Sequence, residues 1–445
     1  MIELANQKNK KIGIFGLART GSAAYRTLLG KAEKVICWDD QEPNRKHFAA
    51  DFGKKPLLNI DDQAWTQLDE IVLSPGVPLK FPKPHPIVEL AKANNIKIIS
   101  DLDLFYESRK DSFIISITGT NGKSTTVALT HFILGEAWDF GGNIGKAALS
   151  MDQDSNGYVI EMSSYQIDLI QEYKSRIAIL LNITPDHLDR HGSFEEYTQT
   201  KASLLELAEI SIIGIDNDIT NDIYEKNKDR LRLIPISTKK ILDYGISVVD
   251  GVIYDHITEK KNFILPPNKH LAGRHNNENI AASFMAAKLF GMKGEAIVHL
   301  IADFKGLPHR LQYLGNKEGI DFYNDSKATN MDSVRGAVQS LSNIHLIAGG
   351  RSKAEKIDSI FDLKDRITRA YFYGESRNEF ANLSDSVIKY DIFDTMSEAF
   401  EAAYLNAKKS GNHPVILLSP GCSSFDQFKN FEERGCFFIK LYDKI

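Results

Sequence analysis

Short apolar runs recur along the whole chain, and most are followed by a longer stretch with helical character. The runs predicted to be strands are residues 11–15, 35–38, 71–73, 96–100, 113–117, 158–161, 177–181, 321–325, 344–348, 370–374 and 415–418. Residues 127–134 and 195–207 are examples of the predicted helices. Strands that alternate with helices predict an α/β fold with mainly parallel sheets.

The chain is too long for a single hydrophobic core. It has 445 residues, whereas single cores stop growing at about 250–300 residues. We expect three domains, at residues 1–101, 102–305 and 306–445. The first and third are predicted to be Rossmann-like, and the central one is predicted to be a P-loop domain.

The charge and apolar composition of the chain argue against some kinds of binding partner. A formal net charge of −5 argues against a broad basic surface for nucleic acid, although it allows a local basic pocket for phosphates. No apolar stretch is long enough to span a bilayer, and residues 1–8 lack a secretory core. Cys37, Cys422 and Cys436 have no metal-type spacing. We therefore expect a cytoplasmic protein that binds neither nucleic acid nor membrane.

The strongest chemical motif is Gly-Thr-Asn-Gly-Lys-Ser-Thr at residues 119–125. A predicted strand precedes it and a predicted helix follows it, so backbone N–H groups and a helix N-terminus can face a phosphate. Lys123 can reach the outer phosphates, and the Ser124 hydroxyl can bind Mg²⁺. Two residues separate the glycines where the usual P-loop has four. The alternative is an ordinary turn that contains Gly-Lys-Ser.

A second glycine turn occurs near the N-terminus. Residues 16–21 follow a predicted strand, and the next strand ends at Asp39. This pattern is typical of a dinucleotide site for NAD, but it is also compatible with another nucleotide diphosphate or with no ligand. Residues 74–76 form a rigid turn after the third strand, at the sheet edge where such folds bind ligands.

Five other polar residues are candidates for phosphate chemistry. Glu161 ends a strand and can bind Mg²⁺, and His187 follows a strand between two aspartates. Asn143 lies in a glycine-rich turn and can present its amide to a phosphate. Lys327 and Arg310 can offset charge on a transferring phosphate. Taken singly, these residues also have structural interpretations, as solvated charges, a loop histidine and a turn asparagine.

Together these motifs resemble the Mur ligases, the ATP-dependent amide ligases of peptidoglycan synthesis. The resemblance covers essentially the whole chain and includes the shortened 119–125 loop, Lys201, residues 273–279 and His309-Arg310. Residues 324–330 and 419–435 are similar to the members that add D-glutamate. The Asp-Asn-Pro-Arg mark of the diamino-acid-adding members is absent from the sequence.

The resemblance implies a reaction and its cofactors. ATP, UDP-N-acetylmuramoyl-L-alanine and D-glutamate would give ADP, phosphate and the UDP-linked dipeptide through an acyl phosphate. ATP would be a co-substrate, Mg²⁺ would occupy two sites, and the protein would be a monomer.

The resemblance also implies roles for particular residues. The catalytic set would be Lys123, Asn143, His187, Lys201 and Lys327. The metal ligands would be Ser124, Glu161, His187 and a carbamylated Lys201. ATP would contact Gly119, Thr120, Asn121, Gly122, Lys123, Ser124, Thr125, Asn276, Asn279, Arg310 and Asp325. The UDP substrate would contact Gly16, Leu17, Ala18, Arg19, Thr20, Gly21, Asp39, Ser74, Pro75, Gly76 and Asn143. D-glutamate would contact Lys327, Thr329, Lys353, Ser424 and Phe431.

Three alternatives compete with this hypothesis. A folylpolyglutamate synthetase would share the central domain but lack a UDP-type first domain. An NAD-dependent dehydrogenase would use the first glycine turn, although Lys123-Ser124 argues against it. A nucleotide-binding regulator would bind ATP without turnover.

Overall fold

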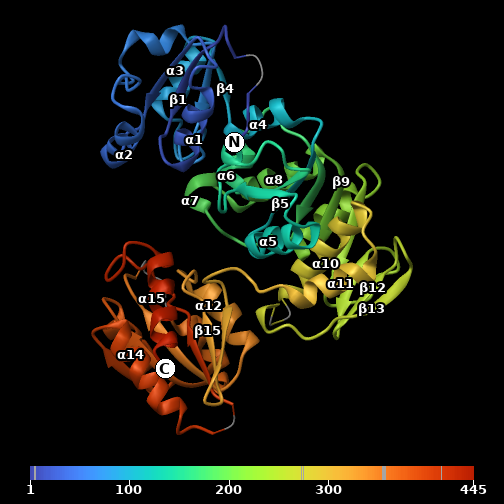
Figure 1. Ribbon diagram of the computed structural model, residues 1–445, viewed down its shortest axis with the longest axis vertical. Helices are drawn as coiled ribbons and strands as arrows, with labels where there is room; N and C mark the ends of the chain where they lie inside the picture. The colour runs from blue at the N-terminus through green and yellow to red at the C-terminus, as the bar shows by residue number, and fades with distance from the viewer. Residues whose placement is uncertain (5–6, 272, 274, 353–356, 412) are drawn as a thin grey trace. The chain divides into compact units, whose positions relative to one another are not determined.

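A computed structural model describes residues 1–4, 7–271, 273, 275–352, 357–411 and 413–445 (Figure 1). The chain forms two compact units. One comprises residues 1–265 and 278–298, and the other comprises residues 266–277 and 299–445. Each unit is described by itself below.

The N-terminal part of the first unit is a four-stranded parallel sheet in the order β2-β1-β3-β4. Its strands are β1 (Lys11–Phe15), β2 (Lys34–Trp38), β3 (Glu70–Leu73) and β4 (Lys97–Ile99). Its helices are α1 (Arg19–Leu28), α2 (Glu42–Phe52), α3 (Pro86–Ala93) and α4 (Asp101–Arg109). The chain leaves β1 toward β2 on one side and returns to β3 on the other. Such a reversal opens a crevice at the carboxyl ends of the strands.

The rest of this unit is built on a nine-stranded sheet in the order β13-β12-β11-β10-β9-β8-β5-β7-β6. Its strands are β5 (Phe113–Thr118), β6 (Asp139–Gly142), β7 (Gly157–Glu161), β8 (Ser175–Leu180), β9 (Ala208–Gly214), β10 (Leu233–Ser237), β11 (Ile246–Val249), β12 (Val252–Asp255) and β13 (Lys261–Ile264). The strands from β6 to β11 are parallel, and β12 and β13 add an antiparallel extension.

The helices of the nine-stranded sheet are α5 (Lys123–Leu134), α6 (Ser164–Leu169), α7 (Leu188–His191), α8 (Phe194–Ser203), α9 (Asp218–Asn227), α10 (His275–Leu289) and α11 (Gly294–Asp303). The β5 side chains Ile114, Ile115 and Ile117 are at most 1% exposed. A strand buried on both faces reads as a continuous apolar run, which is why 113–117 was recognisable as a strand.

One hydrophobic core joins the two sheets of the first unit. It contains Ile12 and Ile14 of β1, Ala24 of α1, and Ile160 and Ala178 of the larger sheet. These buried apolar side chains form one continuous cluster across the two sheets, and their removal from water stabilises it. The two glycine turns are therefore held on one packed body.

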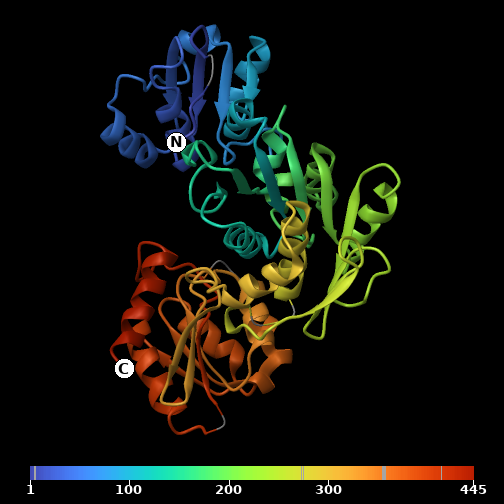
Figure 2. The same ribbon diagram turned by 45° about the vertical axis from the view of Figure 1, so that its right-hand side comes forward.

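The second unit contains a six-stranded sheet in the order β14-β15-β19-β16-β17-β18, parallel except for β14. Its strands are β14 (Gln312–Lys317), β15 (Ile320–Asn324), β16 (Ile344–Gly349), β17 (Ile367–Tyr373), β18 (Tyr390–Phe393) and β19 (Val415–Leu418). Its helices are α12 (Met331–Ser340), α13 (Arg377–Ser384), α14 (Met396–Ala407) and α15 (Phe431–Asp443). Apolar residues of α12 and α13 form one core against the sheet, and those of α14 and α15 form another. Figure 2 shows the ribbon of this unit, with helices on both sides of the sheet.

The α/β class and the mainly parallel sheets are confirmed. The predicted helix at 195–207 is α8 followed by a 3₁₀ turn at Leu204–Leu207. The predicted domain boundaries stay a prediction.

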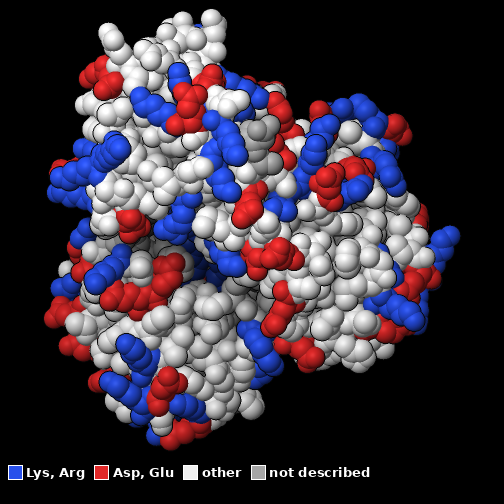
Figure 3. Space-filling view, turned by 45° about the horizontal axis from the view of Figure 1, so that its top comes forward, with Lys and Arg blue, Asp and Glu red and all other residues white. Residues whose placement is uncertain are grey.

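Acidic and basic side chains are interspersed over the face seen in Figure 3. Among the described helices, none combines the length and apolar character needed to cross a bilayer.

Candidate active site

The turn after β5 is the predicted phosphate loop, and its backbone requires glycine. Gly119 and Gly122 have φ values of +155° and +82°, in the region that residues with a Cβ rarely adopt. A Cβ on Gly122 would also collide with the Asn279 side chain of α10. Lys123 begins α5 directly after Gly122. The positive end of a twelve-residue helix therefore faces the loop.

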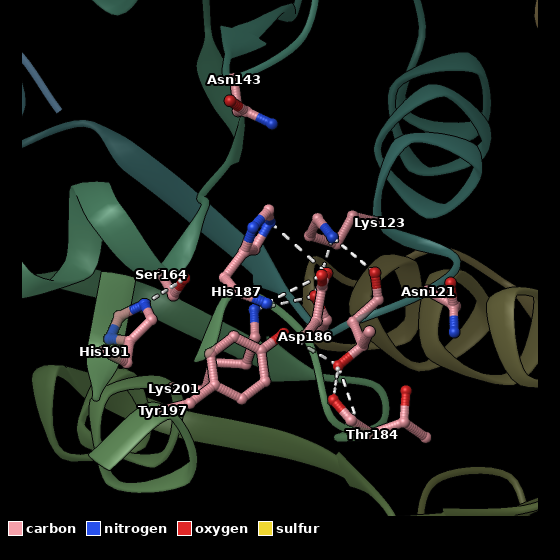
Figure 4. Close-up of polar contacts among 12 residues, drawn as sticks. Asn121, Lys123, Asn143, Ser164, Thr184, Asp186, His187, His191, Tyr197 and Lys201 are labelled. Carbon is pink, nitrogen blue, oxygen red and sulfur yellow. Dashed lines mark hydrogen bonds and ion pairs between the residues drawn. The ribbon is translucent and has the colours of Figure 1, made fainter. Parts of the chain in front are cut away.

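Two lysines reach the same part of this loop (Figure 4). Lys123 Nζ donates to the carbonyl oxygens of Gly119 and Thr120 at 2.8 and 2.7 Å. Lys201 Nζ, from α8, donates to Gly119 O at 2.9 Å and to Thr118 Oγ1 at 3.3 Å. Lys201 is 2% exposed. Burial, and secondly the charge of Lys123, hold the pKa of Lys201 well below its usual value.

The aromatic ring of Tyr197 lies beside Lys201. Its ring centroid lies 5.0 Å from Lys201 Nζ, and its hydroxyl lies 3.0 Å from Thr120 Oγ1. Burial raises the pKa of Tyr197 to about 12, so its hydroxyl stays protonated near neutral pH. Sequence reasoning missed this residue. The available signal was its position four residues before Lys201, which places both on one face of a helix.

A buried carboxylate lies at the end of the neighbouring strand β7. Ser124 Oγ donates to Glu161 Oε2 at 2.6 Å, and Asn143 Nδ2 donates to Glu161 Oε1 at 2.8 Å. Glu161 is 2% exposed. A carboxylate and a hydroxyl beside a phosphate loop are the oxygen ligands that Mg²⁺ prefers. The donor set of Ser124 and Glu161 therefore fits a magnesium ion.

His187 lies on the loop after β8 and is about half exposed, with 49% of its side chain accessible. Its Nε2 atom lies 3.4 Å from Asp186 Oδ2, and its ring centroid lies 5.0 Å from that of Tyr165. His191 was not predicted. It lies 2.9 Å from Ser164 Oγ through Nε2, and burial lowers its pKa.

Asn182 hydrogen-bonds to the phosphate loop, a role that was not predicted from the sequence. Its backbone oxygen accepts from Thr120 N at 2.8 Å, and its Oδ1 accepts from Asn121 N at 2.9 Å. Asn182 Nδ2 in turn donates to Glu278 Oε2 at 2.7 Å. Burial raises the pKa of Glu278 to about 7. A polar residue directly after a buried strand was the only signal for Asn182, because the pairing of β5 with β8 cannot be read from the sequence.

The first glycine turn is organised by Asp39 at the end of β2. The Asp39 carboxylate accepts from Leu17 N at 2.6 Å and from Gln41 N at 2.7 Å. On the other side of the turn, Ser74 Oγ donates to Gly16 O at 2.7 Å. The carboxyl ends of β1, β2 and β3 thus meet at one place, as the sequence predicts.

A single cavity of about 610 Å³ links this turn to the phosphate loop. Of the predicted site residues, its walls include Gly16, Ala18, Arg19, Thr20, Asp39, Ser74, Pro75, Gly76, Lys123, Asn143, His187 and Lys201. Arg19 bridges the two parts by donating to Gly142 O at 2.9 Å and to Gly145 O at 2.7 Å. The cavity therefore runs from the crevice of the first sheet to the lysines of the larger one.

In the second unit, Asp325, Lys327 and Thr329 lie on the loop after β15, Ser424 lies on the loop after β19, and Phe431 begins α15. Asp325 accepts from Leu311 N and from Ser419 Oγ, both at 2.9 Å, and burial raises its pKa to about 7. Lys327 Nζ lies 4.0 Å from the ring centroid of Phe431. Ser424 is 2% exposed.

The remaining predicted residues are placed as follows. Asn279 accepts from Thr126 Oγ1 at 3.0 Å in the first unit. Asn276 is buried, Arg310 and Thr329 are half-buried, and all three belong to the second unit. Lys353 lies outside the described residues. The structure therefore brings together the predicted residues that line the cavity of the first unit, whereas the roles of Asn276, Arg310, Thr329 and Lys353 stay a prediction.

Comparison with known proteins defines the class of protein. The sequence pattern of the Mur ligase middle domain matches residues 117–287, and that of the Mur ligase glutamate ligase domain matches residues 309–422. The chain belongs to the Mur ligase family, whose members are ATP-dependent ligases. One relative is the UDP-N-acetylmuramoylalanine--D-glutamate ligase of Rickettsia bellii, 45% identical over 98% of each chain. The enzyme of that name from Caulobacter vibrioides is 38% identical over 98% of this chain and 96% of its own.

Solved structures support the fold. The UDP-N-acetylmuramate-alanine ligase MurC of Thermotoga maritima matches 98% of this chain and 100% of its own, with a TM-score of 0.61 and 14% identity. The MurF ligase of Thermotoga maritima in complex with ADP matches 99% of this chain and 96% of its own, with a TM-score of 0.60 and 14% identity.

Proposed function

We propose that the protein is the ATP-dependent ligase that joins D-glutamate to UDP-N-acetylmuramoyl-L-alanine in peptidoglycan precursor synthesis. The observation that carries this proposal is the 45% identity to a curated ligase of this name over 98% of both chains. The cavity that links the two glycine turns supports it, because one wall suits a nucleotide diphosphate and the other suits a phosphoryl donor.

The chemistry proceeds in two steps. A carboxylate oxygen of the acceptor attacks the γ-phosphorus of ATP, the bond to the β-phosphate oxygen breaks, and ADP leaves. The amine of D-glutamate then attacks the acyl carbonyl, loses a proton, and inorganic phosphate leaves with the electron pair of the acyl–oxygen bond. Activation is needed because a free carboxylate is a poor acyl donor.

The residues of the larger sheet suit the first step. The Lys123 ammonium lies on the loop carbonyls, from which it can turn to a phosphate that carries developing charge. Glu161 and Ser124 would hold one Mg²⁺ ion, and His187 with a carbamylated Lys201 would support a second. Bound Mg²⁺ would spread the negative charge of the transferring group. The amide of Asn143 would lie near the reacting carboxylate.

The other predicted residues would recognise the substrates. Residues 16–21, Asp39 and 74–76 would hold the UDP group in the crevice of the first sheet. Asn276, Asn279, Arg310 and Asp325 would contact the nucleotide of ATP. The set Lys327, Thr329, Lys353, Ser424 and Phe431 would frame D-glutamate. We assign these roles to domains at residues 1–101, 102–305 and 306–445, in a cytoplasmic monomer.

The test is phosphate release from ATP over a panel of amino acids, with UDP-N-acetylmuramoyl-L-alanine as acceptor. Release that requires both the acceptor and D-glutamate is expected. Release with a folate acceptor would instead indicate a folylpolyglutamate synthetase. A change in nicotinamide absorbance without phosphate release would indicate a dehydrogenase, and nucleotide binding without turnover would indicate a regulator.

A further inference from the structure

Arg434 is a fully buried arginine that none of the roles above uses. It lies in the first turns of α15 and is 0% exposed. All three of its donor nitrogens are engaged: Nε donates to Ser326 Oγ at 3.0 Å, Nη2 to Ser326 O at 2.8 Å, and Nη1 to Cys422 O at 3.0 Å. A planar guanidinium fork can make these three bonds in fixed directions, whereas a lysine ammonium cannot.

The bonds of Arg434 join the two loops that carry the proposed amino-acid contacts. Ser326 immediately precedes Lys327, and Cys422 lies two residues before Ser424. Ser326 Oγ also donates to Phe431 O at 2.8 Å, so the start of α15 is tied to the same point. Arg434 therefore fixes the separation between the loop after β15 and the loop after β19.

A third loop packs against the same guanidinium. A Cβ placed on Gly350 would lie 3.3 Å from Arg434 Nη1, and it would collide with Ser423 O. The Gly349-Gly350 turn ends β16, and Arg351 N continues it by donating to Ser423 O at 2.9 Å. Arg434 thus bonds to the loops that follow β15 and β19 and lies close to the turn that ends β16, and these three strands are neighbours in the sheet.

The charge of Arg434 is also unusual. Among the described residues, no carboxylate forms an ion pair with it, and the acceptors of the three bonds above are two carbonyls and a hydroxyl. The buried carboxyl of Asp325 and the hydroxyl of Tyr373 interact with its charge electrostatically. Burying a charge is costly unless other groups compensate it. A fixed positive charge next to these loops favours binding of an anionic ligand by them, and an amino acid with two carboxylates is such a ligand.

We propose that Arg434 is a positioning residue for the amino-acid substrate: it sets the spacing of the loops that carry Lys327 and Ser424, and it contributes positive potential to the site. This inference rests on the proposed function. It predicts that loss of the guanidinium fork weakens binding of D-glutamate without weakening binding of ATP or of the UDP-linked acceptor.

The experiment compares Arg434→Lys with the wild-type full chain. Phosphate release is measured while D-glutamate is varied at saturating ATP and acceptor, and then while each of these is varied. We expect KM for D-glutamate to rise about tenfold or more, with KM for ATP and for the acceptor unchanged. Arg369→Lys is the matched control, because Arg369 lies near the start of β17 and pairs with Asp391 at 2.9 Å. It should leave all three constants unchanged.

Ser326→Ala keeps the proposal testable if Arg434→Lys does not fold, as judged by its thermal transition. It removes one acceptor of Arg434 and one bond to Phe431 O, so KM for D-glutamate should rise selectively and by less. An unchanged KM for D-glutamate in the folded variants, or an equal rise for all three substrates, would overturn the role of Arg434. A wild-type protein that releases no phosphate with D-glutamate would instead overturn the proposed function.

Discussion

Lys123 and Lys201 donate to the same oxygen atom, the backbone carbonyl of Gly119, at 2.8 and 2.9 Å. Two ammonium groups on one oxygen atom repel each other, so after burial the charge of Lys123 is the second cause that lowers the pKa of Lys201. Lys123 opens α5 and faces the loop, whereas Lys201 is buried. Burial and the charge of Lys123 therefore shift the Lys201 side chain toward its neutral amine form.

A neutral amine at Lys201 can react with CO₂ to form a carbamate, which is an anionic oxygen ligand suited to Mg²⁺. We expect additional density on Lys201 Nζ in a crystal structure, and severe loss of activity in Lys201→Ala. Lys201→Glu should recover part of the activity, because its shorter side chain still supplies a carboxylate. A plain lysine side chain directed to solvent in a well-ordered crystal would contradict the metal role.

Lys123→Ala should abolish nearly all turnover while leaving the fold intact. Its ammonium is the charge closest to the loop carbonyls, and loss of one electrostatic contact to a transition state costs about a hundredfold or more in kcat. The measurement is steady-state phosphate release together with the thermal unfolding transition. Near-normal ligation by a folded variant would show that the loop does not bind the transferring phosphate.

The order of the two chemical steps is testable without D-glutamate. An amine can attack only an activated carbonyl, so the acyl phosphate should form from ATP and the acceptor alone. Positional isotope exchange in ATP, or trapping of the acyl phosphate, measures this step. An absolute requirement for D-glutamate in the exchange would show that the proposed order is wrong.

Glu278 should make the stability of the first unit depend on pH. Its folded-state pKa is raised to about 7, above the reference value of about 4.3. Its contribution to stability is therefore fully present below about pH 4 and is lost as the pH rises through about 7. Glu278→Gln keeps an acceptor for Asn182 and removes the titration, so it should gain on the order of 2 kcal/mol relative to wild type between pH 5 and 8.

The measurement for Glu278 is urea unfolding at several pH values. Exposed Glu195 of α8 supplies the control, since Glu195→Gln changes the same charge on the surface. The control should leave the pH dependence as it is in the wild type. A parallel pH dependence for Glu278→Gln and the wild type would show that Glu278 does not titrate with folding.

The sequence predicted those parts of the site that local chemistry marks. Gly119 and Gly122 are recognisable because their backbone conformations need glycine, and Glu161 is recognisable because it ends an apolar run. Asn182 and Tyr197 were missed because their importance depends on which strands are neighbours and which helix face is turned inward. Arg434 belongs to the motif at residues 419–435, but the burial of its charged side chain cannot be inferred from its neighbours in the chain.

The fold class followed from the alternation of strands and helices, but the sheet order did not. Nothing in residues 113–117 indicates that β5 lies between β7 and β8 rather than beside β6. That order decides which loops meet at the carboxyl edge. Family resemblance supplied the residues expected to meet at that edge, although it did not supply the strand order.

The bracing of the phosphate loop has a consequence for how the protein is made. Asn121 is bonded to Asn182, which lies 61 residues later, and Thr126 is bonded to Asn279, which lies 153 residues later. A growing chain that ends soon after α5 therefore contains the whole phosphate loop but lacks the residues that hydrogen-bond to it. Since a ligand stabilises only the state that binds it, ATP should give no protection to chains that end before α10. Nucleotide binding would then distinguish chains that contain these supporting residues from shorter ones during synthesis.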